Sequence, residues 1–243
     1  EVINELKKKS SQHIVPTCLA LHDFPLEGSV EEYIHDCCEK LLPKVAKEHL
    51  AEYVDIFIET GYYTAKQAVP YFEKAKKLGL GIRVHAEEFS WAGGAKLAAQ
   101  YQARSADHLQ FIREEDAELL SKNQVTATLL PGTSLYSNIG FTSAHLLRKK
   151  GCRIAIASDF NPGSCTIYNL PMLAILSIMK NDMTPEEAFA GITYNAAFSL
   201  GLEKRKGLIK VGYDADLLLH PFATFSQWLA DFGQAEPTVI PIA

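Results

Sequence analysis

The chain has 243 residues, a net charge of −5 and 47% hydrophobic residues, which is enough to fill the core of one large domain. Positive and negative residues are mixed along it, which argues against a partner that is nucleic acid or a membrane surface. The apolar runs are too short to span a bilayer, and five cysteines without paired spacing indicate a reducing compartment, which we take to be the cytoplasm.

Apolar runs and helical patterns alternate through the first half of the chain. A charged helical stretch opens it. Ser29 begins a capping box, and the helix after it is expected to reach about Leu50. A second capping box at Thr64 begins a helix that should end near Leu78, and another helix should start near Gly94. The expected strands are 13–22, 54–60 and 80–88.

The same alternation continues through the second half as far as Thr184, the expected N-cap of a further helix with proline at its first position. Beyond Leu202, the stretch Gly207 to His220 is rich in turn residues and alternates in a β pattern, so it is expected to join a small separate sheet. The expected strands here are 104–109, 125–132 and 153–163, and the expected helices are 114–123, 142–150 and 170–179.

This alternation predicts an α/β fold with parallel strands. No glycine-rich phosphate loop follows the first strand, so a barrel is favoured over a dinucleotide-binding sheet. Six strand–helix units are visible, whereas a closed (β/α)8 TIM barrel needs eight. We therefore expect the first two strands to lie before Glu1, with the barrel over 1–202 (strands 3–8) and a β-rich segment over 203–243.

Polar residues gather where the expected strands end, which is where barrel enzymes place their active sites. Each of these side chains can bind a metal, carry a proton or form a hydrogen bond. They are His22, Glu59, His85, Glu88, His108 and Asp159.

His85 and Asp159 are the candidate metal ligands. For His85 the alternative is a buried core histidine, and for Asp159 it is a carboxylate that caps the following turn. Glu88 is the candidate proton carrier, while its neighbour Glu87 is expected to face solvent. His108 is a candidate ligand or carbonyl-polarising group. The chain has no His-x-His pair, and two ligands hold a catalytic cation loosely.

Several blocks of the sequence together resemble imidazolonepropionases of the amidohydrolase superfamily. They are "VHAEEFSWAGGAKLAAQYQARSADHL", "LLPG", "ASDFNPGS" and "GLIKVGYDADLLL". The resemblance extends from about Thr17 to Leu219. It implies a metal-dependent hydrolase barrel with part of a small β-sandwich, one divalent zinc or iron ion, and hydrolysis of 4-imidazolone-5-propanoate to N-formimidoyl-L-glutamate in histidine degradation.

The resemblance also implies roles for individual residues. His85 and Asp159 match metal ligands, and Glu88, His108 and Asp159 match catalytic groups. The residues that match substrate contacts are His22, Glu88, Asn161, Gly163 and Ser164.

The chain lacks the His-x-His pair that the family carries on its first barrel strand. The alternatives are therefore another cyclic amidohydrolase or deaminase on the same barrel, or a fragment without catalysis. The expected partner is a small-molecule substrate, and a homodimer is left open.

Overall fold

The computed structural model describes residues 1–240 and divides into two compact units. The first runs from Glu1 to Val125, and the second begins at Thr126. The sequence-based boundary between 202 and 203 is a different division and stays a prediction.

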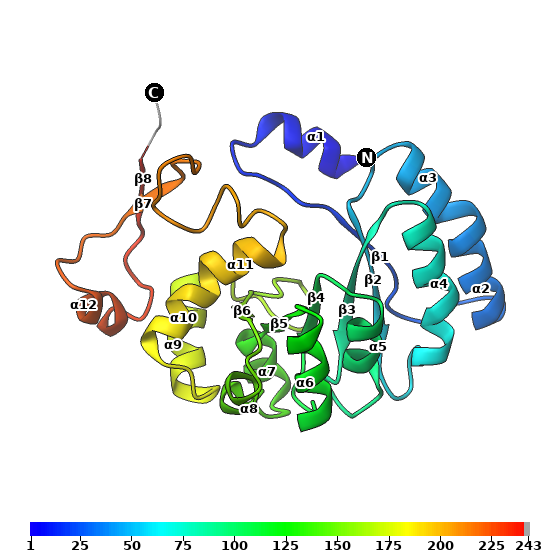
Figure 1. Ribbon diagram of the computed structural model, residues 1–243. Helices are drawn as coiled ribbons and strands as arrows, with labels where there is room; N and C mark the ends of the chain where they lie inside the picture. The colour runs from blue at the N-terminus through cyan, green and yellow to red at the C-terminus, as the bar shows by residue number, and fades with distance from the viewer. Residues whose placement is uncertain (241–243) are drawn as a thin grey trace. The chain divides into compact units, whose positions relative to one another are not determined.

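Four parallel strands form the sheet of the first unit (Figure 1). They pair in chain order, and their buried residues include Val54, Ile56 and Ile58, each fully enclosed. Strands covered on both faces read as nearly continuous apolar runs, which is how the sequence predicted them. The strands are β1 (Thr17–Leu21), β2 (Tyr53–Ile58), β3 (Gly81–Ala86) and β4 (Ser105–His108).

Helices flank this sheet, and Figure 1 shows α2 and α4 alongside β1 to β3. The capping boxes at Ser29 and Thr64 are both formed, so these two helix starts are confirmed. The charged opening stretch is helical as expected. The helices are α1 (Val2–Lys9), α2 (Val30–Asp36), α3 (Leu42–Lys47), α4 (Ala65–Lys77), α5 (Gly94–Gln100) and α6 (Glu114–Lys122).

The helix expected from Ser29 to about Leu50 is present from Val30 to Lys47, with a change of helix type inside it. A π-helical turn, η1 (Cys37–Leu41), separates α2 from α3. Pro43 lies in the first turn of α3. Proline lacks a backbone N–H and its ring clashes with the carbonyl four residues earlier, so the wider π turn upstream relieves that conflict.

The second unit contains the parallel pair β5 (Thr126–Leu129) and β6 (Ile154–Ile156). The strand expected over 125–132 is too long, because helix α7 (Pro131–Ser137) begins inside it. Proline is favoured at the first turn of a helix, where its missing N–H costs no hydrogen bond. The other helices are α8 (Ala144–Lys149), α9 (Leu170–Lys180), α10 (Pro185–Ile192) and α11 (Tyr194–Ser199).

Only part of the β-rich tail is strand. β7 (Leu217–Leu219) pairs antiparallel with β8 (Thr238–Ile240), so a small separate sheet is present as expected. Helix α12 (Phe225–Ala230) lies between them and was not predicted. Its start is a further capping box, in which Thr224 accepts from the backbone of Gln227.

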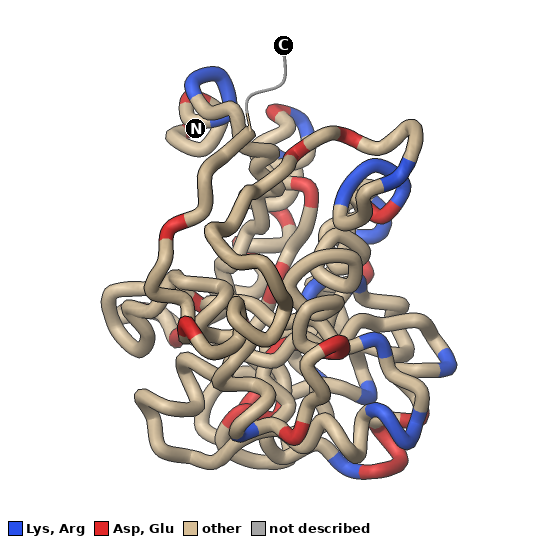
Figure 2. The backbone as a smooth tube through the Cα atoms, turned by 90° about the vertical axis from the view of Figure 1, so that its left-hand side faces the viewer, with Lys and Arg blue, Asp and Glu red and all other residues tan. Residues whose placement is uncertain are grey.

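Lysine and arginine are interspersed with aspartate and glutamate along the backbone, as Figure 2 shows. The mixed charge noted in the sequence is therefore also mixed in space. Among the described residues, no helix combines the length and the apolar character needed to cross a bilayer.

Candidate active site

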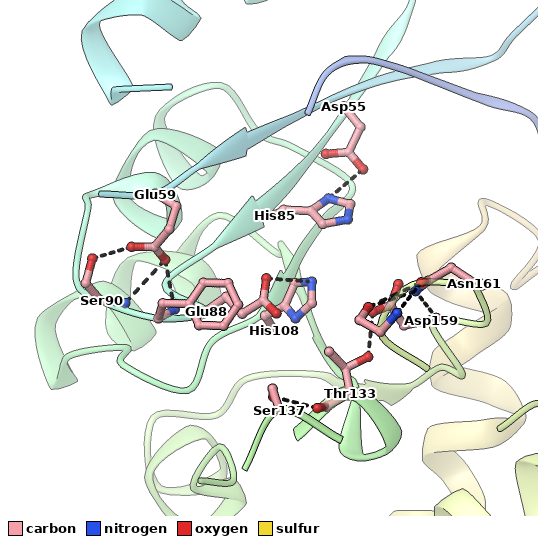
Figure 3. A network of polar contacts seen from close by, with 12 residues as sticks. Asp55, Glu59, His85, Glu88, Ser90, His108, Thr133, Ser137, Asp159 and Asn161 are labelled. Atoms are coloured by element: carbon pink, nitrogen blue, oxygen red, sulfur yellow. Dashed lines mark hydrogen bonds and ion pairs between the residues drawn. The ribbon is translucent and has the colours of Figure 1, made fainter. Parts of the chain in front are cut away.

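His85 and Asp55 face each other from neighbouring strands of the first unit (Figure 3). Nδ1 of His85 lies 3.0 Å from Oδ2 of Asp55, and the other carboxylate oxygen accepts from the backbone N–H of Ile56 at 2.7 Å. Asp55 is 4% exposed. A buried carboxylate that accepts a hydrogen bond from Nδ1–H leaves the lone pair on Nε2, which is how metal-binding imidazoles are usually held.

Asp107 joins this pair. Its backbone is opposite His85 in the β3–β4 ladder, and one ligand atom from each of Asp55, His85 and Asp107 lies within 4.8 Å of the others. Two carboxylates and one imidazole are donors of the types that bind a divalent cation, but the Asp55 oxygen that faces Nδ1 of His85 cannot orient the imidazole and ligate an ion at the same time. Of these three residues, only His85 is predicted from the sequence as a ligand. The signal for Asp55 was an aspartate inside the apolar strand "VDIFI", whereas Asp107 lies in the polar strand "SADH" directly before His108.

Glu88 and His108 form a second buried pair. Nε2 of His108 is 3.6 Å from Oε2 of Glu88, and the two residues are 2% and 7% exposed, respectively. Burial holds the pKa of His108 well below its usual value, with a smaller contribution from His85 and then His22. His108 is therefore a neutral imidazole at pH 7, and its ring centroid lies 5.1 Å from that of His85.

His108 also has an unusual backbone. Its φ angle is +79° and that of Leu109 is +67°. Residues with side chains rarely adopt the left-handed region, and such conformations concentrate at functional sites. The turn that follows β4 therefore fixes the direction of the His108 ring.

Glu87 was expected to face solvent, and this expectation is wrong. Its side chain is fully buried, and Oε2 accepts from the backbone N–H of Ala95 at 2.7 Å. The φ angle of +51° turns it away from Glu88 and toward the start of α5. Burial raises the pKa of Glu87 to about 7, although the N–H groups of the helix start lower it in part.

His22 follows the last residue of β1 and is exposed. Its ring stacks on Phe57 with centroids 5.4 Å apart and meets the edge of His85 at 6.0 Å. The first unit thus brings His22, His85, Glu88 and His108 together, as the sequence predicted. Their individual roles stay predictions.

Asp159 belongs to the second unit, in the segment after β6. It has a φ angle of +51°, and Oδ2 accepts from Oγ1 of Thr133 at 2.5 Å. Thr133 is buried on α7, a helix that the sequence analysis missed, so this contact was missed with it. The assignment of Asp159 as a metal ligand and catalytic group stays a prediction.

Asn161 shapes the loop after Asp159. Its Oδ1 accepts from the backbone N–H groups of Gly163 at 2.9 Å and Ser164 at 2.7 Å, and its Nδ2 donates to the carbonyl of Asp159 at 2.7 Å. Figure 3 shows Asn161 beside Asp159. Asn161 therefore holds a tight turn whose two amide groups are used internally. Substrate contacts by Asn161, Gly163 and Ser164 stay predictions.

The model of the Amidohydrolase family matches residues 71–239. The chain belongs to the amidohydrolase family. That match includes His85, Glu88, His108 and Asp159.

Two curated relatives are imidazolonepropionases from Bacillus cytotoxicus and Bacillus mycoides. Each is 37% identical over 222 residues, which covers 90% of this chain and 52% of the relative. The chain thus spans about half the length of the curated relatives it matches.

Solved structures give the fold. A 5-methylcytosine deaminase from Klebsiella pneumoniae superposes with a TM-score of 0.75 at 14% identity, over 97% of this chain and 63% of that one. An adenosine deaminase from Xanthomonas campestris with bound zinc gives 0.69 at 16% identity, over 92% and 57%. The described residues form part of a TIM barrel of the metal-dependent hydrolase type, as the sequence predicted.

Proposed function

We propose that this chain carries the catalytic half of an imidazolonepropionase, which hydrolyses 4-imidazolone-5-propanoate to N-formimidoyl-L-glutamate. The observation that carries the proposal is the buried pair of Glu88 and neutral His108 beside His85. The 37% identity to curated imidazolonepropionases supports the substrate. The proposed location of the protein is the cytoplasm, because its five cysteines show no paired spacing.

The residues present fit a divalent cation, zinc or iron. His85 would bind through Nε2, because Asp55 is placed to take the proton of Nδ1. Asp159 would supply a carboxylate, and its bond from Thr133 would fix which oxygen faces the ion. When bound, the cation supplies Lewis-acid chemistry that activates water and polarises a carbonyl.

The chain's own residues then manage protons and charge. Water adds to the imidazolone carbonyl carbon, and one of its protons passes to Glu88. As the ring C–N bond breaks, Glu88 returns that proton to the departing nitrogen. Neutral His108 donates a hydrogen bond to the carbonyl oxygen as negative charge develops there. His22, exposed at the end of β1, contacts the substrate.

The experiment joins residues 1–243 to the N-terminal part of a Bacillus imidazolonepropionase, which supplies a His-x-His pair. The fused protein, loaded with zinc or iron(II), is assayed with 4-imidazolone-5-propanoate by loss of imidazolone absorbance. We expect turnover of imidazolone and none of guanine or cytosine. Deamination of either base with no imidazolone hydrolysis would move the protein to the deaminase class, which the solved deaminase structures make the second candidate.

A further inference from the structure

We infer that Glu59 is a positioning residue, which anchors the loop that carries Glu88 to the end of β2. This rests on the proposed function, in which Glu88 moves the proton. Glu59 follows the last residue of β2 and is 2% exposed. A carboxylate this deeply buried is costly unless donors surround it.

Four donors do so. Oε1 accepts from the backbone N–H of Thr60 at 2.7 Å and from the hydroxyl of Ser90. Oε2 accepts from the backbone N–H groups of Phe89 at 2.9 Å and Ser90 at 3.3 Å. Three of the four donors therefore come from the two residues that directly follow Glu88. Figure 3 shows Ser90 next to Glu59.

The hydroxyl contact is itself supported from β2. Oγ1 of Thr60 lies 2.6 Å from Oγ of Ser90. Because Ser90 gives its proton to Glu59, Thr60 is the donor in this second bond. Residues 59 and 60 thus hold residues 89 and 90 through a connected network, which is more rigid than separate bonds.

The loop is held at two further points. Upstream of Glu88, the buried carboxylate of Glu87 accepts a hydrogen bond from the backbone N–H of Ala95. The backbone carbonyl of Glu87 accepts one from the N–H of Phe111 at 2.9 Å. Downstream, the indole of Trp91 donates to Asp116 at 2.7 Å. Glu59 acts between these points, on the residues next to Glu88.

The two oxygens of Glu59 are both needed. A glutamine of the same size has one acceptor oxygen and presents an NH2 group on the other side. In Glu59→Gln, the new NH2 group therefore faces two hydrogen-bond donors in either orientation of the amide. These donors are the backbone N–H groups of Phe89 and Ser90 in one orientation, and the Thr60 N–H and the Ser90 hydroxyl in the other. The loop should shift, and a displacement of about 1 Å at a reacting group can cost on the order of 10²-fold in rate.

The first test uses residues 1–243 and needs no turnover. Glu59→Gln should speed hydrogen exchange at the Phe89 and Ser90 amides by on the order of 10-fold. With the second tryptophan removed by Trp228→Phe, the emission of Trp91 should also change. The matched control is Glu52→Gln, the same chemical change just before β2, where Glu52 pairs with Lys7 at the surface. Unchanged exchange and emission in Glu59→Gln would overturn the inference.

The second test uses the fused protein. Glu59→Gln should lower kcat on the order of 10²-fold with little change in KM or metal content, whereas Glu52→Gln should leave all three unchanged. A rise in KM or a fall in metal content, with kcat unchanged, would overturn a positioning role. If Glu59→Gln fails to fold, Ser90→Ala removes one donor from the loop side and should give the same changes at smaller size.

The two hypotheses fail in different ways. Faster exchange at Phe89 and Ser90 without imidazolone turnover in the unsubstituted fused protein would reject the proposed function and keep the anchor. Imidazolone turnover that Glu59→Gln leaves unchanged would keep the function and reject the anchor.

Discussion

Glu87 and Glu88 are adjacent buried carboxylates with opposite surroundings. Glu87 accepts from the backbone at the start of α5, and Glu88 lies near the imidazole of His108. The left-handed φ of +51° at Glu87 separates the two directions. Glu87 therefore holds the loop, and the catalytic role of Glu88 stays a proposal.

Replacing Glu88 tests that division. Glu88→Gln in the fused protein should keep the metal and lose about 10²–10⁴-fold in kcat, because an amide cannot carry the proton. Metal content and steady-state kinetics measure the two effects separately. A change confined to KM would mean that Glu88 only holds the substrate.

Asp159 tests the predicted metal ligand. Asp159→Asn in the fused protein should lower both metal occupancy and turnover, because an amide lacks the negative charge that offsets the cation. Thr133→Val is the comparison, since it removes the hydrogen bond to Asp159 but keeps the carboxylate. We expect a smaller loss of metal from Thr133→Val, and normal metal with normal turnover in Asp159→Asn would reject the assignment.

Residue-scale prediction could name candidates where a strand end was visible in the sequence, and the roles of those candidates stay predictions. His22, His85 and His108 follow or end apolar runs, and the first unit brings their rings together. It missed Asp55, Asp107 and Thr133, whose relevance depends on which neighbour lies across a ladder or on a helix start. Those pairings are tertiary contacts between residues distant in the sequence, and a local sequence pattern does not reveal them.

At the scale of elements, helix starts were the most predictable feature. Capping boxes at Ser29, Thr64 and Thr184 are all formed, because the motif satisfies backbone groups locally. The errors lie where local rules compete. Pro43 follows a π turn inside an otherwise continuous helix, and Pro131 turned the end of an expected strand into a helix start.

The N-cap at Thr64 should make a measurable contribution to the free energy of unfolding. Thr64→Ala removes the acceptor for the Gln67 amide at 3.2 Å and should lower the free energy of unfolding by about 1 kcal/mol. Denaturant unfolding of residues 1–243 measures this. Lys66→Ala, in the first turn of the same helix, is the control and should change stability by less than about 0.5 kcal/mol. Equal effects of the two would show that the cap contributes nothing.

Close packing also explains one glycine of α7. A Cβ on Gly132 would lie 2.7 Å from the sulfur of Cys165 and 3.2 Å from Leu173. Gly132→Ala should therefore destabilise the chain by about 1–3 kcal/mol. Calorimetry compares it with Leu135→Ala, whose side chain is 46% exposed on the same helix. A Gly132→Ala protein as stable as the unsubstituted chain would mean that α7 shifts freely.

The chain as a whole should bind zinc weakly and lack imidazolone turnover on its own. The sequence contains no His-x-His pair, and the chain spans 52% of the length of its curated relatives. In the candidate metal group of the described residues, His85 is the one imidazole, and the other two members, Asp55 and Asp107, are carboxylates. Catalytic zinc sites usually combine three protein ligands in fixed positions, and a loosely held ion does not position water for attack.

A zinc titration of residues 1–243 against a competing chelator, followed by the imidazolone absorbance assay, measures both properties. For residues 1–243 alone we expect weak zinc binding and no turnover. When the N-terminal part of a Bacillus imidazolonepropionase is joined to the chain, we expect tight zinc binding and turnover. The fused protein with Glu88→Gln controls for activity brought by the added part. Stoichiometric tight binding with turnover by residues 1–243 alone would mean that the acidic group around His85 suffices, or that a second copy of the chain completes the site.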